Sequence, residues 1–590
     1  MQLKLILLFF WASSLYAGED FAFSKPWLNL LHYKKGFFGY KSRAKRPEFF
    51  LSSEGMTNPK DELVKTLEAF NRDPDLACRF PARHKLLRTQ TKLKERGACP
   101  ELDKWLKGID AGDLYLVYSS AYPSNPASLF GHTFLRFDRK KYSDSKVSSK
   151  LLGYSLAFQA QTNSDDNSFI YTFKGMTGGY DSYLEIKPHY MDIGAYNNSE
   201  SRDLWEYKIP ISEEEKELML LHVWELITGT TFSYYFLDEN CSTHVLALLE
   251  AVKPEWDFSS KSDLFVVPQT TLIEVLEKSE HRVVGFRPAI KRLIWARVNR
   301  MDKGELSRVF AAKEDVNQIS KLKTADEFDL LIDLWKFDNY KAGTKLDASS
   351  KEKMDKVLIA RANLEEAPIA IDLKEENQDR APDLAHKFKK LGVGYLETPY
   401  VEFSYGFHSF DDPILGYDEK SYIKFLEGMI FYEEKEFELR RFDLIKITSL
   451  QNFSFSYPHF SWEINLFANQ ERREEKLPKK ISLSGGIGFS LLRSSWQLFF
   501  IPEAKGSIDT GTGKKKIEAL LKLSFKKSLT KNFQFVFESE YLPSKSSDKE
   551  VLLGPKFNLS LGRQVVLEVG GEYLSTEKKM RPRAQLHAYF

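Results

Sequence analysis

The pattern of apolar and polar residues divides the chain into parts with different periods. Residues 18–105 repeat apolar positions every three or four residues, as in DELVKTLEAF, which is the period of an amphipathic helix. Residues 106–260 mix helical segments with strand-like ones, and residues 261–394 are again helical and highly charged. From 395 to 590 the period is two, which is typical of β-strands. We therefore expect a multidomain protein with an α+β domain, a helical connecting region and a C-terminal all-β domain.

The C-terminal part alternates over about eleven segments of about ten residues each, which is the pattern of a transmembrane β-barrel with a lipid face and a lumen face. In ISLSGGIGFSLL, one face carries Ile481, Leu483, Ile487, Phe489 and Leu491, and the other carries Ser482, Ser484, Gly486, Gly488 and Ser490. Because bacterial single-chain barrels have even strand numbers, we expect an antiparallel barrel of about ten to twelve strands. A soluble antiparallel sandwich also alternates and is the alternative.

The final segment, RAQLHAYF, predicts which side chains of the last strand face lipid. Leu586, Ala588 and Phe590 share one face, which we expect to contact lipid, while His587 and Tyr589 face the lumen. A terminal aromatic residue on an alternating strand resembles the assembly signal of outer-membrane barrels. These features favour a barrel over a sandwich.

The first residues have the pattern of a secretory signal peptide. Lys4 supplies a positive charge, Leu5–Phe10 form an apolar run, and small residues lead up to Ala17. Because this run is too short to span a bilayer comfortably, we expect residues 1–17 to be removed on export. The sequence contains no later run of about 20 apolar residues, so no transmembrane helix is predicted.

The chain has three cysteines, and export to an oxidising compartment would favour disulfide formation between two of them. Cys78 and Cys99 are expected to form a disulfide that contributes up to a few kcal/mol, which leaves Cys241 unpaired. The cysteines do not have the spacing of a zinc site, and we predict neither a metal nor a cofactor. The formal net charge of +2 gives no reason to expect nucleic acid as a partner.

Cys241 has the surroundings of a nucleophile. It lies in FLDENCSTH, where a helix is expected to begin, and a helix N-terminus stabilises a thiolate and offers free N–H groups to an oxyanion. A nucleophilic cysteine needs a lowered thiol pKa and a base. We prefer His132, in the strand GHTFLRFD, over His244, which we expect to have a secondary role or to lie on the helix surface. A buried thiol and a packed strand histidine are the structural alternatives.

Other candidates surround this pair. The strand LLGYSLAFQAQ offers two polar residues to orient His132; we assign Ser155, and Gln159 remains the alternative. Arg136 could contact a phosphate headgroup or form a salt bridge, and Asn240 could contact substrate or hold the turn before the helix. The aromatic residues near these motifs are candidates for an acyl groove or for ordinary core: Phe130, Tyr234, Tyr235 and Phe236.

Four separated segments resemble one known family. They are SNPASLFGHTFLRF, GMTGGYDS, SRDLWEYKI and YYFLDENCSTHVLALLE, and their order over residues 112–255 is that of the domain of the lipoprotein N-acyltransferase Lnb. That domain is similar to permuted NlpC-type and lecithin:retinol acyltransferase-like enzymes, which have a papain-like fold with the histidine strand before the cysteine helix. His132 precedes Cys241 in the same way. The resemblance implies acyl transfer from a phospholipid, through a Cys241 thioester, to the N-terminal amine of a lipoprotein.

The predicted barrel is a departure from this family, whose membrane portion is helical. It would place the catalytic domain in the periplasm at the outer membrane, whereas lipoprotein N-acylation normally finishes at the inner membrane. The acyl acceptor therefore has to be established by experiment. Two other functions remain open: an NlpC-type cysteine hydrolase acting on peptidoglycan peptides or phospholipid esters, and a barrel protein whose periplasmic domain only binds a partner.

Overall fold

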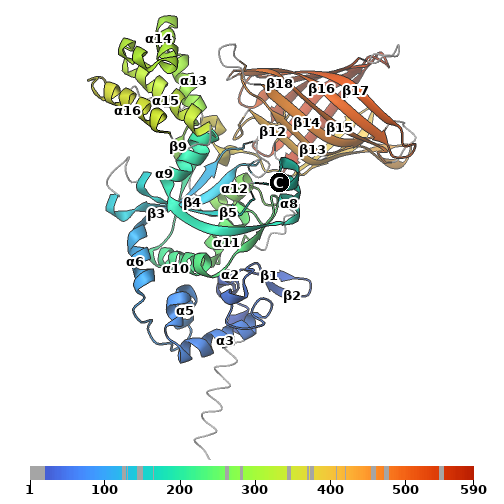
Figure 1. Ribbon diagram of the computed structural model, residues 1–590. Coiled ribbons are helices and arrows are strands. Elements are labelled where there is room, and N and C mark those ends of the chain that lie inside the picture. The colour runs from blue at the N-terminus through green and yellow to red at the C-terminus, as the bar shows by residue number, and fades with distance from the viewer. Residues whose placement is uncertain are drawn as a thin grey trace, which may run out of the picture. The chain divides into compact units, whose positions relative to one another are not determined.

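A computed structural model describes most of the chain (Figure 1). The described residues are 20–122, 128, 130–142, 151–163, 165–258, 265–279, 283–341, 347–367, 371, 378–406, 408–418, 420–453, 460–470, 477–493, 495–543 and 550–590. The predicted signal peptide, residues 1–17, lies outside them. The chain divides into two compact units, Met1–Leu373 and Lys374–Phe590, which we describe separately.

A seven-stranded antiparallel sheet forms the centre of the first unit, with the strand order β8-β6-β5-β4-β3-β7-β9. The strands are β3 (Ala111–Ser119), β4 (His132–Arg139), β5 (Tyr154–Ala160), β6 (Tyr180–Pro188), β7 (Leu204–Ile209), β8 (Phe232–Tyr234) and β9 (Val283–Arg287). Central strand β4 is buried along most of its length, so it carries apolar residues on both faces.

Helices cover both faces of this sheet. Thr133 of β4 contacts Ser242 of α11, whereas the next residue, Phe134, packs with Ile193 of η4. Because successive side chains of a strand point to opposite faces, α11 and η4 lie on opposite sides of the sheet. The helices of this part are α8 (Ser168–Thr177), α9 (His189–Asp192), the π-helix η4 (Ile193–Ser199), α10 (Glu213–Gly229), α11 (Cys241–Val252) and α12 (Pro268–Ser279).

The N-terminal segment packs against α10 and contains a hairpin as well as the expected helices. Its elements are α2 (Lys25–Leu30), β1 (Tyr33–Gly36), β2 (Gly39–Ser42), η1 (Pro47–Phe49), α3 (Pro59–Arg72), α4 (Leu76–Arg79), α5 (Pro81–Arg88) and α6 (Pro100–Ile109). Arg83 is fully buried between Glu62, at 3.2 Å, and Glu225 of α10, at 3.1 Å. Cys78 and Cys99 form a disulfide with their Cα atoms 5.4 Å apart.

The α/β part extends beyond the boundary expected at residue 260. Helix α12 packs on α11 and β4, and β9 pairs with β7, so both complete the sheet layer rather than belonging to a connector. The following helices have a separate apolar core that includes Leu330, Leu331 and Val357. They are α13 (Ile290–Val298), α14 (Lys303–Glu314), η5 (Val316–Lys321), α15 (Ala325–Lys341) and α16 (Ala348–Ala362). None of the helices among the described residues is long and apolar enough to cross a membrane.

The second unit is a closed antiparallel barrel of twelve strands, which confirms the predicted architecture (Figure 1). The short 3-10 helices η6 (Gln378–Arg380) and η7 (Pro382–Leu384) precede it. The strands are β10 (Lys390–Leu396), β11 (Thr398–Ser404), β12 (Ser421–Glu433), β13 (Glu436–Ser449), β14 (Ser461–Asn469), β15 (Lys480–Arg493), β16 (Trp496–Asp509), β17 (Lys515–Ser528), β18 (Phe533–Leu542), β19 (Glu550–Ser560), β20 (Val565–Leu574) and β21 (Lys579–Tyr589). First strand β10 pairs with last strand β21, so no sheet edge is left open.

The two faces of the barrel wall have the predicted polarity. In β15, Ile487 is 64% exposed on the outside, whereas Ser482 is fully buried on the inside. In β21, Leu586 and Ala588 face outward, and His587 and Tyr589 face the lumen. Phe590 also faces outward, but it follows the strand rather than ending it, and its amide donates to the Lys389 carbonyl at 2.9 Å.

Candidate active site

Asn240 fixes the position at which helix α11 begins, one residue before Cys241. Its Oδ1 accepts hydrogen bonds from the amides of Ser242, at 2.9 Å, and Thr243, at 3.4 Å. Its Nδ2 donates to the carbonyls of Phe236 and Val266, at 3.1 and 2.7 Å. Both polar atoms of this buried side chain thus have partners, with Oδ1 capping the helix and Nδ2 holding two loop carbonyls. Asn240 holds the turn before the helix and is not available to bind substrate, contrary to its assignment as a substrate-binding candidate.

The cap also limits which amides can stabilise an oxyanion. We expected several free N–H groups at the start of α11, but Asn240 accepts from two of them. The amide of Cys241 itself has no hydrogen-bond acceptor among the residues that the structure describes. This single N–H, adjacent to the thiol, is therefore the donor that remains for a developing oxyanion.

Strand β4 brings His132 to the region of Cys241. Helix α11 packs on β4, and the residues that follow the two candidates are in contact, with Thr133 Oγ1 3.1 Å from Ser242 Oγ. The ring of Tyr196 lies 5.2 Å from the ring of His132. Burial and nearby carboxylates raise the pKa of Tyr196, and Cys241 is near enough to contribute to this effect. Within the described part of the chain, no hydrogen bond joins His132 directly to Cys241.

Cys241 and His132 do not form a thiolate–imidazolium ion pair in the resting site. Burial raises the pKa of the Cys241 thiol, and Thr133, Ser242 and the Arg202 guanidinium oppose this effect without overcoming it. Burial and then Arg202 lower the pKa of His132 to about 3. The resting site therefore contains a neutral thiol and a neutral imidazole, whereas the sequence suggested a thiolate. A neutral imidazole can still accept a proton when the sulfur attacks.

Ser155 does not contact His132. In the register of β4 and β5, Ser155 lies opposite Arg136, and its Oγ is 2.8 Å from Nδ1 of His189. The assignment of Ser155 as the residue that orients the base is therefore wrong, because it lies four residues along the ladder from His132. The pairing of β4 with β5 ends at Leu135 and Leu156, and Gln159 lies farther along β5 toward the His132 end of β4, so Gln159 stays the open alternative.

Arg136 is fully buried and forms ion pairs with Asp138 and with Glu206, the latter at 3.4 Å. Its guanidinium also stacks on Tyr115, 4.2 Å from the ring centroid. A guanidinium with these partners is not free to bind a phosphate headgroup, so only the salt-bridge alternative holds. The sequence offered both alternatives for Arg136 and gave no indication of which carboxylates would pair with it.

These observations define a buried cysteine at a helix start and a histidine at the start of the strand on which that helix packs. Residues 101–278, which contain both, match the family model of the Lnb N-terminal periplasmic domain. We call this part the Lnb-type domain. Residues 19–90 and 379–590 match two further family models, each described as a domain of unknown function (DUF7843 and DUF7840). A comparison with curated proteins found no match.

Solved structures that are similar to the chain include porins. The KdgM porin in complex with disordered oligogalacturonate is 10% identical, with 34% of this chain and 98% of that chain covered and a TM-score of 0.23. The NanC porin is 4% identical, with 34% and 98% covered and a TM-score of 0.25. A loop-deletion mutant of OmpT, an outer membrane protein of Vibrio cholerae, is 6% identical, with 34% and 97% covered and a TM-score of 0.19.

The location of the protein follows from its own barrel and from the Lnb-type domain. The barrel is closed, antiparallel and even-numbered, with apolar residues outside and polar residues inside, as in the outer membrane. The family matched by residues 101–278 is a periplasmic domain. The chain is thus an envelope protein of the outer membrane with its Lnb-type domain in the periplasm.

The aromatic candidates of the Lnb-type domain form core rather than an open groove. Tyr234 and Phe236 are buried together with Tyr180. Tyr235 packs over Gly178, where φ is +76° and an added Cβ would approach the tyrosine ring to 2.2 Å. Phe130 is partly buried in the turn before β4. The segment GMTGGY therefore serves to let these rings pack closely beside the cysteine.

The apolar surface near these rings is on helix α8, which the sequence did not single out. Ile170, Phe173 and Met176 are 40%, 62% and 46% exposed, while Tyr171 of the same helix packs against Phe236 at 5.3 Å between ring centroids. A spacing of three residues places the exposed side chains along one strip of the helix. Tyr171 connects the helix that carries this strip to the buried rings of Tyr180 and Phe236.

The structure corrects the prediction for His244 and adds Tyr196 and Arg202 to the surroundings of the site. His244 is fully buried and stacks on Phe158 at 4.5 Å, so it belongs to the core and not to the helix surface. Tyr196 and Arg202 are near both His132 and Cys241, and Arg202 Nε donates to the Ser120 carbonyl at 2.6 Å. Neither pattern nor motif indicated Tyr196, because it lies in a π-helix without regular periodicity.

Proposed function

We propose that this protein is a cysteine acyltransferase that moves an acyl chain from a phospholipid to the N-terminal amine of a lipoprotein. The observation that carries the proposal is the position of Cys241 at the start of α11, packed on the strand that begins with His132, within an Lnb-type domain. The order of histidine strand and cysteine helix on one antiparallel sheet supports a permuted NlpC-like, papain-like arrangement.

In the first step, the Cys241 sulfur attacks the carbonyl carbon of the phospholipid ester. Nε2 of His132, which is buried and has no hydrogen-bond partner among the described residues, accepts the thiol proton. The amide of Cys241 donates to the oxyanion of the tetrahedral intermediate. The ester C–O bond then breaks, and the imidazolium returns its proton to the departing lysophospholipid oxygen. The product is a thioester on Cys241.

In the second step, an amine nitrogen attacks the thioester carbon. A C–N bond forms, the C–S bond breaks, and His132 carries the amine proton to the leaving sulfur. Water would give hydrolysis instead, so the burial of Cys241, which is 3% exposed, favours transfer over hydrolysis. Attachment to an outer-membrane barrel raises the local concentration of the phospholipid donor without taking part in the chemistry.

The direct test uses the full-length protein in detergent with a phospholipid labelled in its acyl chain. We expect intact-mass and peptide mass spectrometry to find the label as a thioester on Cys241, and a diacylated lipopeptide with a free N-terminal amine to remove it as an amide. Release of the label as fatty acid in the presence of lipopeptide would favour the hydrolase. Absence of any thioester would contradict both enzymes and favour a binding domain.

The low pKa of His132 makes a specific prediction about pH. Because this imidazole stays unprotonated until the pH approaches about 3, the base is competent throughout the neutral and mildly acidic range. The single-turnover rate of thioester formation should therefore show no acid limb between about pH 5 and 7.5, where an ordinary histidine with a pKa of about 6.5 would give one. A rate that falls with a midpoint near 6.5 would contradict the lowered pKa of His132.

The exposed strip on α8 is expected to contact the phospholipid. Phe173→Asp should lower thioester formation from phospholipid vesicles by about 10-fold, since a carboxylate replaces buried apolar contact at the lipid surface. The rate with a short-chain, water-soluble ester should stay the same. Ile359→Asp on α16, which changes a side chain of similar exposure (63%), is the matched control. Equal loss with both substrates would indicate damage to the fold and not to lipid binding.

A further inference from the structure

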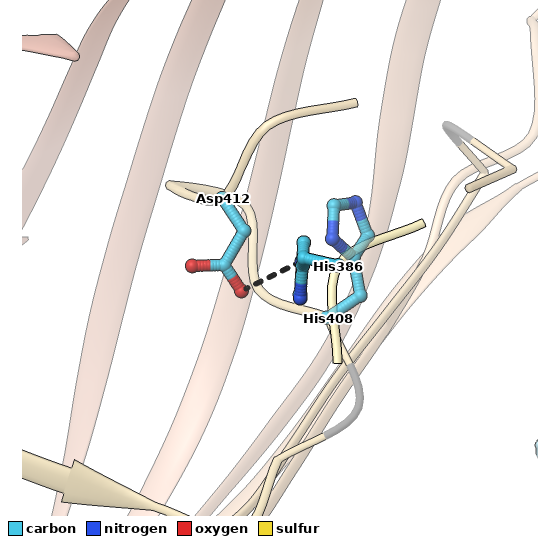
Figure 2. A group of neighbouring side chains, drawn as sticks. All are labelled: His386, His408 and Asp412. Carbon is cyan, nitrogen blue, oxygen red and sulfur yellow. Dashed lines mark ion pairs between the residues drawn. The ribbon is translucent and has the colours of Figure 1, made fainter. Parts of the chain in front are cut away.

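Three buried side chains come together in the barrel unit, outside the Lnb-type domain (Figure 2). His386 precedes strand β10, while His408 and Asp412 lie between β11 and β12. One ligand atom from each lies within 4.8 Å of the others, and Nε2 of His386 is 4.0 Å from Oδ2 of Asp412. All three residues are at most 5% exposed. The sequence does not indicate this cluster, because its three residues come from two separate segments without a metal-binding motif.

The segment that carries His408 and Asp412 is held against the inner wall of the barrel. Nζ of Lys526, a fully buried residue of β17, donates to the carbonyls of Phe410 and Asp412, at 2.9 and 3.0 Å. Gln534 of β18 donates to the carbonyl of Asp411 at 2.8 Å. The backbone of His408 exchanges two hydrogen bonds with Ile423 of β12. These contacts fix the positions of His408 and Asp412.

His386 and Asp412 are each oriented by hydrogen bonds to residues outside the cluster. Nδ1 of His386 is 2.6 Å from the carbonyl of Lys387, which can only accept, so this nitrogen carries the proton and Nε2 has a free lone pair. The carboxylate of Asp412 accepts from the Tyr589 hydroxyl and from the Ser409 amide, both at 2.7 Å. An imidazole whose far nitrogen donates to a carbonyl is the usual arrangement of a metal-binding histidine.

Among the described residues, the histidine nitrogens that face the centre of the cluster have no hydrogen-bond partner. Within the described chain, neither Nε2 of His386 nor either ring nitrogen of His408 has a hydrogen bond. A buried polar group without a partner costs about 1–3 kcal/mol, so these nitrogens are unfavourable without a ligand. One metal ion would bind Nε2 of His386 and one ring nitrogen of His408. A protonated His386 paired with Asp412 would not satisfy them, because 4.0 Å is too long for a hydrogen bond and His408 would stay unpaired.

We propose that His386, His408 and Asp412 bind a divalent transition metal ion, with zinc as the ion that the donor set fits best. Two imidazole nitrogens and one carboxylate oxygen suit zinc, with a fourth position for water, whereas magnesium and calcium prefer oxygen ligands alone. Zinc–ligand bonds of about 2.0–2.1 Å place neighbouring donors roughly 3.3 Å apart. Small side-chain rotations would bring the donor atoms to this separation.

The site would have a structural role at the seam where the barrel closes. His386 lies on the segment that leads into β10, and Tyr589, which holds Asp412, is on β21, the strand that pairs with β10. The ring of Tyr589 also stacks on His386, with centroids 3.8 Å apart. A bound ion would therefore link the entry segment, the segment 408–412 and the last strand.

The test measures metal binding by the full-length protein in detergent after treatment with a chelator. Wild type should bind one Zn²⁺ per chain in a titration followed by elemental analysis, and its thermal transition should rise with zinc. His408→Ala should weaken zinc binding by about 100-fold or more, since it removes a ligand. His587→Ala, which removes a neighbouring lumen histidine outside the cluster, is the matched control and should bind like wild type.

Two further measurements distinguish the loss of a metal ligand from the loss of the barrel fold. Heat-dependent electrophoretic mobility shows whether each variant forms a closed barrel, and Asp412→Asn offers a second, nearly isosteric ligand change. Cobalt bound by wild type should give visible absorption bands that both ligand variants lose. The proposal is overturned if chelator-treated wild type binds no zinc, or if His408→Ala and Asp412→Asn form barrels and bind zinc as tightly as wild type.

Discussion

Replacing Cys241 with serine is expected to lower acyl transfer by about 10⁴-fold or more while leaving the fold and the barrel intact. The physical reason lies in the base. An imidazole whose pKa is about 3 is a weak base. It can accept the proton of a thiol while the sulfur attacks, but it is too weak to accept the proton of the far less acidic serine hydroxyl. The change removes little volume from a buried site, so stability should hardly change. The measurement is label transfer from phospholipid, with electrophoretic mobility as the check on folding.

The matched control for Cys241→Ser is the double variant Cys78→Ser/Cys99→Ser. It removes the other two sulfurs, which form the disulfide, and leaves Cys241 as the only thiol. The protein should lose a few kcal/mol of stability, roughly 2–5, and still form the thioester. An active Cys241→Ser variant, or a thioester that disappears only in the double variant, would show that the nucleophile is elsewhere.

The second large effect is expected on stability. Arg83→Ala should destabilise the first unit by about 3–5 kcal/mol, because it leaves the carboxylates of Glu62 and Glu225 buried without a counter-charge. Arg83 Nη2 also donates to the carbonyl of Phe49 at 2.7 Å, so the variant loses a third partner. Urea unfolding monitored by tryptophan fluorescence should show an earlier transition of this unit, with the barrel transition unchanged.

A surface ion pair provides the comparison. Lys65 and Glu68 are 3.0 Å apart on α3 but both are exposed, and Lys65→Ala should leave the urea transition where it is. If Arg83→Ala and Lys65→Ala unfold at the same urea concentration as wild type, the buried triad does not stabilise the unit. If both shift equally, the effect comes from α3 and not from the charges.

The barrel could be predicted from the sequence because its signal is local. Each strand repeats with a period of two, and residues such as Ile487 and Ser482 report the two faces without any knowledge of neighbouring strands. The same holds for the helix start at Cys241, which the residues around it define. The extent of the sheet was harder to predict from the sequence, because β9 is a short edge strand that joins the sheet only by pairing with β7.

The roles within the site depended on information that the sequence does not carry. Ser155 and Gln159 lie on the same strand and the same face, and only the register of β4 and β5 separates them. The two alternatives for Arg136 could be separated only by the structure, which places Glu206 beside its guanidinium. The metal-binding cluster joins side chains from two separate segments, and its ligands have no common motif, so its detection required three-dimensional proximity.

The buried triad of Arg83, Glu62 and Glu225 also constrains the order in which the exported chain can fold. The chain crosses the inner membrane from its N-terminus, so residues 19–90, a sequence family of their own, emerge well before α10. Arg83 cannot be enclosed with both counter-charges until Glu225 has followed. The N-terminal segment therefore cannot complete its buried ion pairs until more than a hundred further residues have followed. A family boundary at residue 90 is thus not a boundary of independent folding.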